Sequence, residues 1–182
     1  MAMTSERAHA QGRGNEAVKK MVLTAFMAAL ITLLTAYICH VPIGINEGYI
    51  HFGDAFIYIA AAILPTPYAM AAGAIGAGLA DLLTAPVWAP ATIIIKLLLV
   101  LPFTSKENKV ICKRNVMALF MAFVILVSGY FLAEGVMFGF KAALLTSVLG
   151  NVIQASGSAA IFILFGTALD RMHFKTRFLK NS

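Results

Sequence analysis

Apolar residues occupy the chain in long runs, and short polar or Pro- and Gly-rich stretches separate them. A helix needs about 20 residues to cross a bilayer core of about 30 Å, and several of these runs approach that length. The runs predict six helical spans, at residues 20–40, 54–64, 68–83, 91–103, 116–133 and 141–170. The sequence therefore predicts an all-α membrane protein, a bundle of six transmembrane helices.

Polar segments flank this predicted membrane domain, which covers residues 19–172. Residues 1–18 form a polar N-terminal segment, and residues 173–182 form a basic tail. Twelve of the fourteen Lys and Arg residues fall on one side of the six-span arrangement, Lys141 alone on the other, and Lys96 within a span. Because cytoplasmic loops carry the excess of Lys and Arg, we predict a multi-pass protein of the cell membrane with both termini cytoplasmic.

The composition agrees with a location in the lipid bilayer. The 182 residues are 60% hydrophobic and only 12% charged, whereas soluble proteins are about 25% charged. The net charge of +6 comes from basic residues whose placement fits the predicted membrane topology and which do not cluster on a soluble element. We therefore expect no nucleic-acid partner. The chain lacks GxxxxGK[ST], HExxH and GxSxG sequences, so we expect no catalytic residue and no metal or cofactor bound by this chain.

Four polar residues interrupt the last apolar run at intervals of 4, 3 and 4: Ser147, Asn151, Gln154 and Ser158. At this spacing they share one face of a helix. An amide group in hydrocarbon without a hydrogen-bond partner is destabilising by roughly several kcal/mol. The stripe is therefore either a seam between helices or part of a binding site.

Other polar and aromatic side chains are predicted to lie in the outer half of the bundle. They include Tyr49, His51 and Asp54 with Asn46 and Glu47 in and after the first external loop, and Asp81, Trp88, Lys96 and Glu134 further along. Asn151 lies about 15 Å below the outer end of its helix at 1.5 Å per residue, so one outward-facing cavity can collect these groups. Lys96 lies inside an apolar span and either snorkels, pairs with an acid such as Asp81, or contacts a ligand.

Small residues mark one face of the first span, where Ala25 and Ala29 are one helical turn apart. Small side chains allow another helix to approach closely in a membrane. From the spacing alone, packing against a neighbouring span of the same chain is the favoured interpretation.

Four strings together resemble the integral membrane S component of an energy-coupling factor (ECF) vitamin transporter, over about residues 18–172. They are AxxxA (Ala25–Ala29), YIHFGDAFIYIAA (Tyr49–Ala61), GAIGAGLADLL (Gly73–Leu83) and GNVIQ (Gly150–Gln154). Within that family the chain is most similar to members assigned to hydroxymethylpyrimidine or pyridoxine. Riboflavin, folate, pantothenate and biotin remain open as substrates.

The resemblance implies a high-affinity binding subunit that captures a small heteroaromatic vitamin or precursor from outside. Its partners would be a transmembrane coupling subunit and two cytoplasmic ATPases, which use the ATP and Mg²⁺. Delivery would occur by toppling of the whole subunit, with the first external loop as a gate. In such proteins the alanine motif faces the coupling subunit, which gives Ala25 and Ala29 a partner-binding role.

The resemblance also implies a substrate site, with ligand contacts from the first external loop and the outer parts of the later spans. The amides of Asn151 and Gln154 can bond the edge of a heteroaromatic ring because an amide both donates and accepts. Glu134 or Lys96 would recognise a substituent. The remaining candidates are His51, Tyr49 and Trp88, which would close over the ring, and Asp81. The alternatives are a stand-alone facilitator or small secondary transporter and, less favoured, an intramembrane enzyme.

Overall fold

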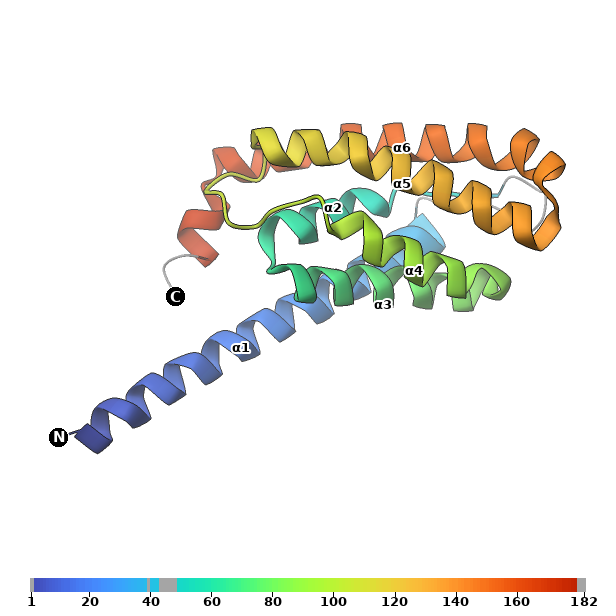
Figure 1. Ribbon diagram of the computed structural model, residues 1–182. Helices are drawn as coiled ribbons and strands as arrows, with labels where there is room; N and C mark the ends of the chain where they lie inside the picture. Colours follow the sequence, from blue (N-terminus) through green and yellow to red (C-terminus); the bar gives the residue numbers. More distant parts are fainter. Residues whose placement is uncertain (1, 39, 43–48, 180–182) are drawn as a thin grey trace.

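Six main helices build the protein in the computed structural model, which describes residues 2–38, 40–42 and 49–179 (Figure 1). The elements are α1 (Ala2–Leu33), the π-helical turn η1 (Leu34–Ile38), β1 (Val41–Pro42), β2 (Tyr49–Ile50), α2 (Asp54–Ile63), α3 (Thr66–Thr84), the 3₁₀ turn η2 (Pro86–Trp88), α4 (Ala89–Val100), α5 (Lys113–Phe138), α6 (Phe140–Arg171) and the π-helical turn η3 (Lys175–Leu179). The two short strands pair antiparallel, with Val41 opposite Ile50.

Three helical stretches within the described residues are long and apolar enough to cross a membrane: Gly14–Ile38, Lys113–Phe138 and Phe140–Arg171. Asp54–Ile63 and Pro86–Val100 are apolar but shorter. Large apolar side chains on α5 and α6 are exposed, as expected of surfaces that contact lipid. Apart from the two short strands the described residues are thus mainly helical, with helices long and apolar enough to cross a membrane, while the number of crossings and the side on which the termini lie remain predictions.

The helix α1 begins well before the first predicted span. It starts at Ala2, so the polar segment assigned to residues 1–18 is helical over its described part and continues without a break into the apolar stretch. Figure 1 shows this first half of α1 projecting away from the bundle. Ala, Glu, Arg, Gln and Lys in this segment favour the helical backbone.

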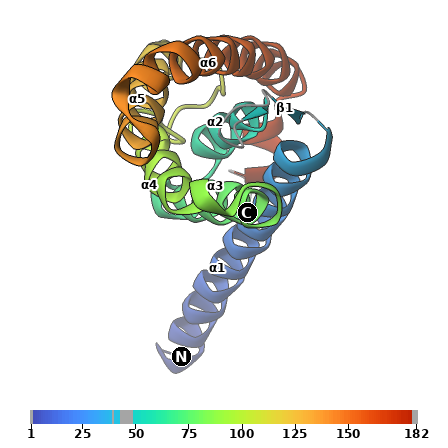
Figure 2. The ribbon, with the colours of Figure 1, turned by 90° about the vertical axis from the view of Figure 1, so that its right-hand side faces the viewer.

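The short helix α2 lies inside a ring formed by the other five main helices (Figure 2). Nine of its ten residues are buried. A ten-residue helix is about 15 Å long, roughly half of the bilayer core. Its first residue, Asp54, therefore lies deep in the bundle rather than at a membrane surface.

The helices α1 and α3 cross in very close contact. A Cβ added at Gly76 would lie 2.7 Å from the Ala28 carbonyl oxygen and 2.8 Å from Ile31 Cβ, so only glycine fits there. At the same crossing the Thr32 hydroxyl donates to the Gly76 carbonyl at 2.8 Å. This contact holds the small-residue helix α3 against α1 without a large side chain between them.

Candidate functional site

An ion pair in the interior joins the beginning of α2 to the middle of α4. Lys96 Nζ lies 2.7 Å from Asp54 Oδ1 and 3.0 Å from Oδ2, and both side chains are 0% exposed. The carboxylate also lies at a helix N-terminus, where the backbone dipoles favour a negative charge. The partner of Lys96 is therefore Asp54 and not Asp81, the acid that the sequence offered as the structural alternative.

Gln154 of α6 extends this pair into a network. Its Nε2 donates to Asp54 Oδ2 at 2.9 Å, and its Oε1 accepts the backbone N–H of His51 at 3.2 Å. Gln154 and His51 are only 3% and 4% exposed. Residues from α2, α4, α6 and the segment before α2 thus meet in one buried polar network, defined here as Asp54, Lys96, Gln154 and His51.

The His51 ring lies among hydrogen-bond donors. The Gly53 N–H points at Nδ1 at 3.2 Å, and Gln154 Nε2 lies 3.3 Å from Nε2. A neutral imidazole accepts at only one nitrogen, so one of these contacts is a hydrogen bond and the other is not. A protonated ring would face donors on both sides. Burial lowers the pKa of His51 from 6.5 to about 4, although the Asp54 charge acts in the opposite direction.

Aromatic side chains border the network on the side of α4 and α5. Lys96 Nζ lies 5.1 Å from the centre of the Tyr130 ring, within the range of a cation–π contact. The Tyr130 hydroxyl bonds the Thr92 hydroxyl at 2.8 Å, and the Trp88 ring centre lies 6.0 Å from that of Tyr130. Trp88 is therefore one aromatic ring away from the ion pair.

The polar stripe on α6 splits into parts with different partners. Ser147, Gln154 and Ser158 are buried, and Asn151 is half-buried. The Asn151 amide donates within its own helix, to the Ser147 carbonyl at 2.8 Å and hydroxyl at 3.0 Å. Among the contacts of the described residues, Gln154 is the member of the stripe that joins the buried network.

Two further predicted site residues, Glu134 and Asp81, are also buried. Glu134 of α5 is buried and accepts a hydrogen bond from the Thr146 hydroxyl of α6. Asp81 is buried near the end of α3. The backbone of Tyr49 pairs with Pro42, and its side chain lies outside the described part of the chain, as do Asn46 and Glu47.

Sequence reasoning placed Asp54 among the outer polar groups without giving it a role in the substrate site, and it did not select Tyr130 or Thr92. The pairing of Asp54 could have been predicted, because a lysine inside an apolar span requires an acid at a similar depth in the membrane. The second apolar run is short, so Asp54 at its beginning lies at about the depth of Lys96. Tyr130 and Thr92 gave no comparable signal, because they lie in ordinary apolar spans and their pairing depends on how α4 and α5 pack.

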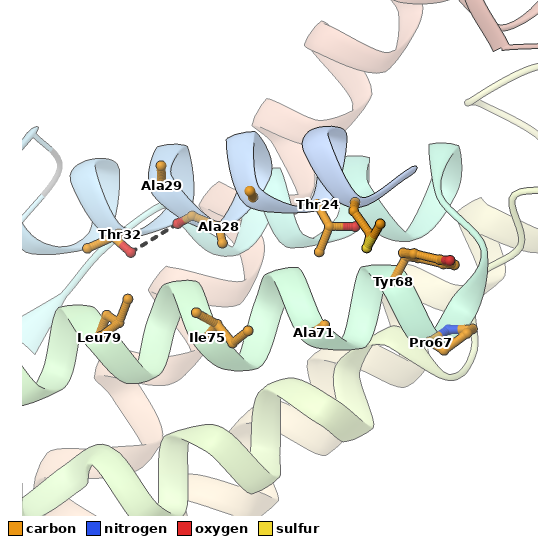
Figure 3. A pocket seen from close by; sticks show the side chains of 11 residues that line it. Thr24, Ala28, Ala29, Thr32, Pro67, Tyr68, Ala71, Ile75 and Leu79 are labelled. Atoms are coloured by element: carbon orange, nitrogen blue, oxygen red, sulfur yellow. Dashed lines mark hydrogen bonds between the residues drawn. The ribbon is translucent and has the colours of Figure 1, made fainter. Parts of the chain in front are cut away.

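A groove opens on the outer side of the crossing between α1 and α3, with a volume of about 580 Å³ (Figure 3). Its lining is mostly apolar: Met21, Thr24, Ala25, Ala28, Ala29, Thr32, Pro67, Tyr68, Ala71, Ile75 and Leu79. Ala28 is buried against α3, whereas Ala25 and Ala29 are exposed in the groove. The residue of this small face that packs internally is therefore Ala28, and the two alanines of the AxxxA motif are open to a partner.

Within the described part of the chain, no three His, Cys, Asp or Glu side chains are arranged to hold a metal ion. The two oppositely charged members of the buried network, Asp54 and Lys96, neutralise each other. The network is a set of mutually bonded polar groups in an apolar surrounding.

Two comparisons with known proteins bear on the chain. A protein of Pyrococcus woesei described as "Uncharacterized protein in gap 3'region" is 35% identical over 63 residues, which are 35% of this chain and 43% of the relative. The chain thus spans less than half the length of that relative. The family described as "ECF-type riboflavin transporter, S component" matches residues 15–171, nearly the whole chain and all of its main helices from the middle of α1 onward. This chain belongs to the S component family of ECF-type riboflavin transporters.

Proposed function

We propose that this chain binds a planar heteroaromatic vitamin or vitamin precursor against the polar face of α6. The observation that carries the proposal is the buried network, in which Lys96 of α4 and Gln154 of α6 converge on Asp54 of α2 inside an apolar bundle. As an S component the chain is a vitamin-binding subunit of a transporter and not an enzyme. The proposal adds where the vitamin binds and what recognises it.

The chemistry of this region fits a neutral ring. Because Lys96 and Asp54 form a close pair, they offer no net charge to a ligand. The amides of Asn151 and Gln154 can donate to and accept from the edge of a nitrogen heterocycle, and Trp88 with Tyr130 supplies aromatic surface nearby. Riboflavin, named in the family description, and hydroxymethylpyrimidine or pyridoxine, suggested by the sequence, all present such an edge.

Mass spectrometry of small molecules that co-purify with the protein identifies the substrate directly. Titration of the purified chain with riboflavin, hydroxymethylpyrimidine and pyridoxine then ranks them, and we expect one of the three to bind at least tenfold more tightly than the others.

Substitution of the two amides tests where the ring binds. Loss of one polar contact in a buried site costs about 1–3 kcal/mol, which corresponds to about a 5- to 150-fold weaker Kd for Asn151→Ala or Gln154→Ala. Ser128→Ala is the control, because the Ser128 hydroxyl is exposed on α5 and bonds only to its own helix at Val124 among the described contacts. If both amide variants keep the Kd within twofold of the wild type, the polar stripe is a structural seam.

We propose further that the groove between α1 and α3 receives a helix of the transmembrane coupling subunit, that two ATPases drive the complex, and that the substrate is delivered by toppling. Ala25→Leu with Ala29→Leu would fill the groove, because both alanines are exposed there. This variant should still bind substrate but should no longer co-purify with the coupling subunit. Ala160→Leu, an exposed alanine on α6, is the matched control.

Reconstitution in liposomes distinguishes this function from that of a stand-alone carrier. The chain alone should bind substrate without accumulating it, and uptake should require the coupling subunit, the ATPases and ATP. Robust uptake by the chain alone would instead identify a facilitator or secondary transporter.

A further inference from the structure

Five segments are joined by hydrogen bonds at one end of the bundle, the end at which α4 leads into α5 and α6 finishes (Figure 1). The Asp170 carboxylate at the end of α6 accepts the backbone N–H groups of Val110 and Ile111 at 2.7 and 2.9 Å. Asn115 in the first turn of α5 accepts the Thr104 N–H at 2.8 Å and donates to the Val110 carbonyl at 2.9 Å. The connection between α4 and α5 is therefore fixed to both long helices.

The C-terminal turn η3 is fastened to the same place. Lys175 is buried, and its Nζ donates to the Ser105 carbonyl at 2.9 Å and to the Ala62 carbonyl in the last turn of α2 at 2.8 Å. The ammonium group thus bonds backbone carbonyls of two other segments. The end of the bundle is a surface built from parts of the chain that are far apart in sequence and joined by these hydrogen bonds.

Exposed charges on this surface are almost all positive. The exposed cationic side chains are Lys106, Lys109, Lys113, Arg114, Arg171 and Arg177, and we call this set the basic rim. Glu107 is the exposed acid among them. The Asp170 carboxylate adds one negative charge, which the buried Lys175 ammonium at the same end offsets. Six cations against one exposed acid leave an excess of five positive charges.

The basic rim borders directly on the apolar surface of α5 and α6. Val116, Met117 and Phe120 are exposed within two turns of Lys113, and Leu164 and Phe165 within two turns of Arg171. Helices that cross a bilayer place such apolar side chains against acyl chains and place the terminal cations at the level of the headgroups. A molecule that satisfies both surfaces at once has an anionic head and an apolar tail.

We propose that the basic rim binds the headgroups of anionic phospholipids. A soluble acidic protein would match the charges but would leave the adjoining apolar surface uncovered, so lipid is the occupant that fits both. The inference does not depend on which vitamin the chain binds. Each Lys or Arg near an anionic surface strengthens binding about fivefold, since it contributes about 1 kcal/mol.

Native mass spectrometry of the full chain in detergent tests the proposal, with phosphatidylglycerol and phosphatidylcholine of identical acyl chains as probes. The wild type should bind phosphatidylglycerol at least tenfold more tightly than phosphatidylcholine. Lys106→Gln with Lys109→Gln should lose about 10- to 25-fold of the phosphatidylglycerol affinity and none of the phosphatidylcholine affinity. The pair Lys113→Gln with Arg171→Gln should behave alike, which gives a second variant on different helices.

Lys141→Gln is the control, because Lys141 is exposed at the opposite end of α6. The proposal is overturned if the wild type binds the two lipids equally, if both double variants keep the phosphatidylglycerol affinity within twofold, or if Lys141→Gln weakens it as much as they do. Displacement of phosphatidylglycerol by millimolar inorganic phosphate would also overturn it, because a site for a soluble anion would then explain the charge.

Discussion

The ion pair between Asp54 and Lys96 can be tested by a double-mutant cycle. Asp54→Asn keeps the shape of the side chain and an oxygen that can accept the Gln154 amide, but it removes the charge. Lys96→Met keeps the length and the apolar stem of the side chain. The double variant carries neither charge. Four proteins, including the wild type, then isolate the interaction between the two groups.

The expected loss of stability follows from the burial of both side chains. Both side chains are 0% exposed, so either single substitution leaves one charge in the interior without its counter-ion. Such a loss costs about 3–5 kcal/mol, whereas replacing both partners by uncharged groups of similar volume is often close to neutral. At about 2–4 °C per kcal/mol for a chain of this size, each single variant should melt about 6–20 °C below the wild type. The double variant should recover most of that loss.

Thermal unfolding of the purified chain in detergent, followed by tryptophan fluorescence and light scattering, measures these shifts. The exposed pair Glu16–Lys20, with a distance of 3.3 Å, is the matched control in the same chain. The cycle of Glu16→Gln and Lys20→Met should give a coupling energy of about 0.3–0.5 kcal/mol. If the buried single variants melt within about 2 °C of the wild type, or the double variant melts at the sum of their losses, Asp54 and Lys96 do not act as a pair.

Two further predictions concern the segment that enters α2. Because burial lowers the pKa of His51 to about 4, the unfolded chain binds a proton at this ring between pH 6.5 and 4 that the folded chain does not; the stability should therefore fall by about 2 kcal/mol from pH 7 to pH 5, and His51→Gln should remove that part of the pH dependence of the melting temperature. A Cβ at Gly157 would lie 2.2 Å from Phe52 Cε1, whereas one at Gly14 meets nothing within 4 Å. Gly157→Ala should cost about 1–3 kcal/mol and Gly14→Ala should not destabilise the protein; equal melting temperatures of the two variants would contradict the close contact.

The helical content and the membrane character were predictable from sequence because both depend on local pattern. A span such as residues 116–133 has few polar groups, and in lipid such a segment can satisfy its backbone only as a helix. The spacing of Ser147, Gln154 and Ser158 likewise placed them on one face of α6, and all three are buried. Periodicity alone gave the direction in which these side chains point.

The partners of these groups were not predictable in the same way. The sequence offered Asp81 as an acid for Lys96, but the ion pair is formed with Asp54, which is far from Lys96 in sequence. The placement of α2 inside the ring of helices decides this pairing, since it brings the first residue of a ten-residue helix to the depth of Lys96. Likewise, Asn151 and Gln154 lie on one face, yet the first bonds within its own helix and the second bonds across the bundle.

The sequence by itself determined that this chain is a helical membrane protein, which family it resembles, and which polar residues need a partner in the membrane. Those properties follow from residue type and from spacing along one helix. Only the tertiary structure decided that Asp54, Lys96, Gln154 and His51 form one network, and that Ala28 is buried at the base of a groove in which Ala25 and Ala29 are exposed. The physical reason is that hydrogen bonds and close packing act over about 3–4 Å between helices whose relative depth and rotation no local pattern specifies.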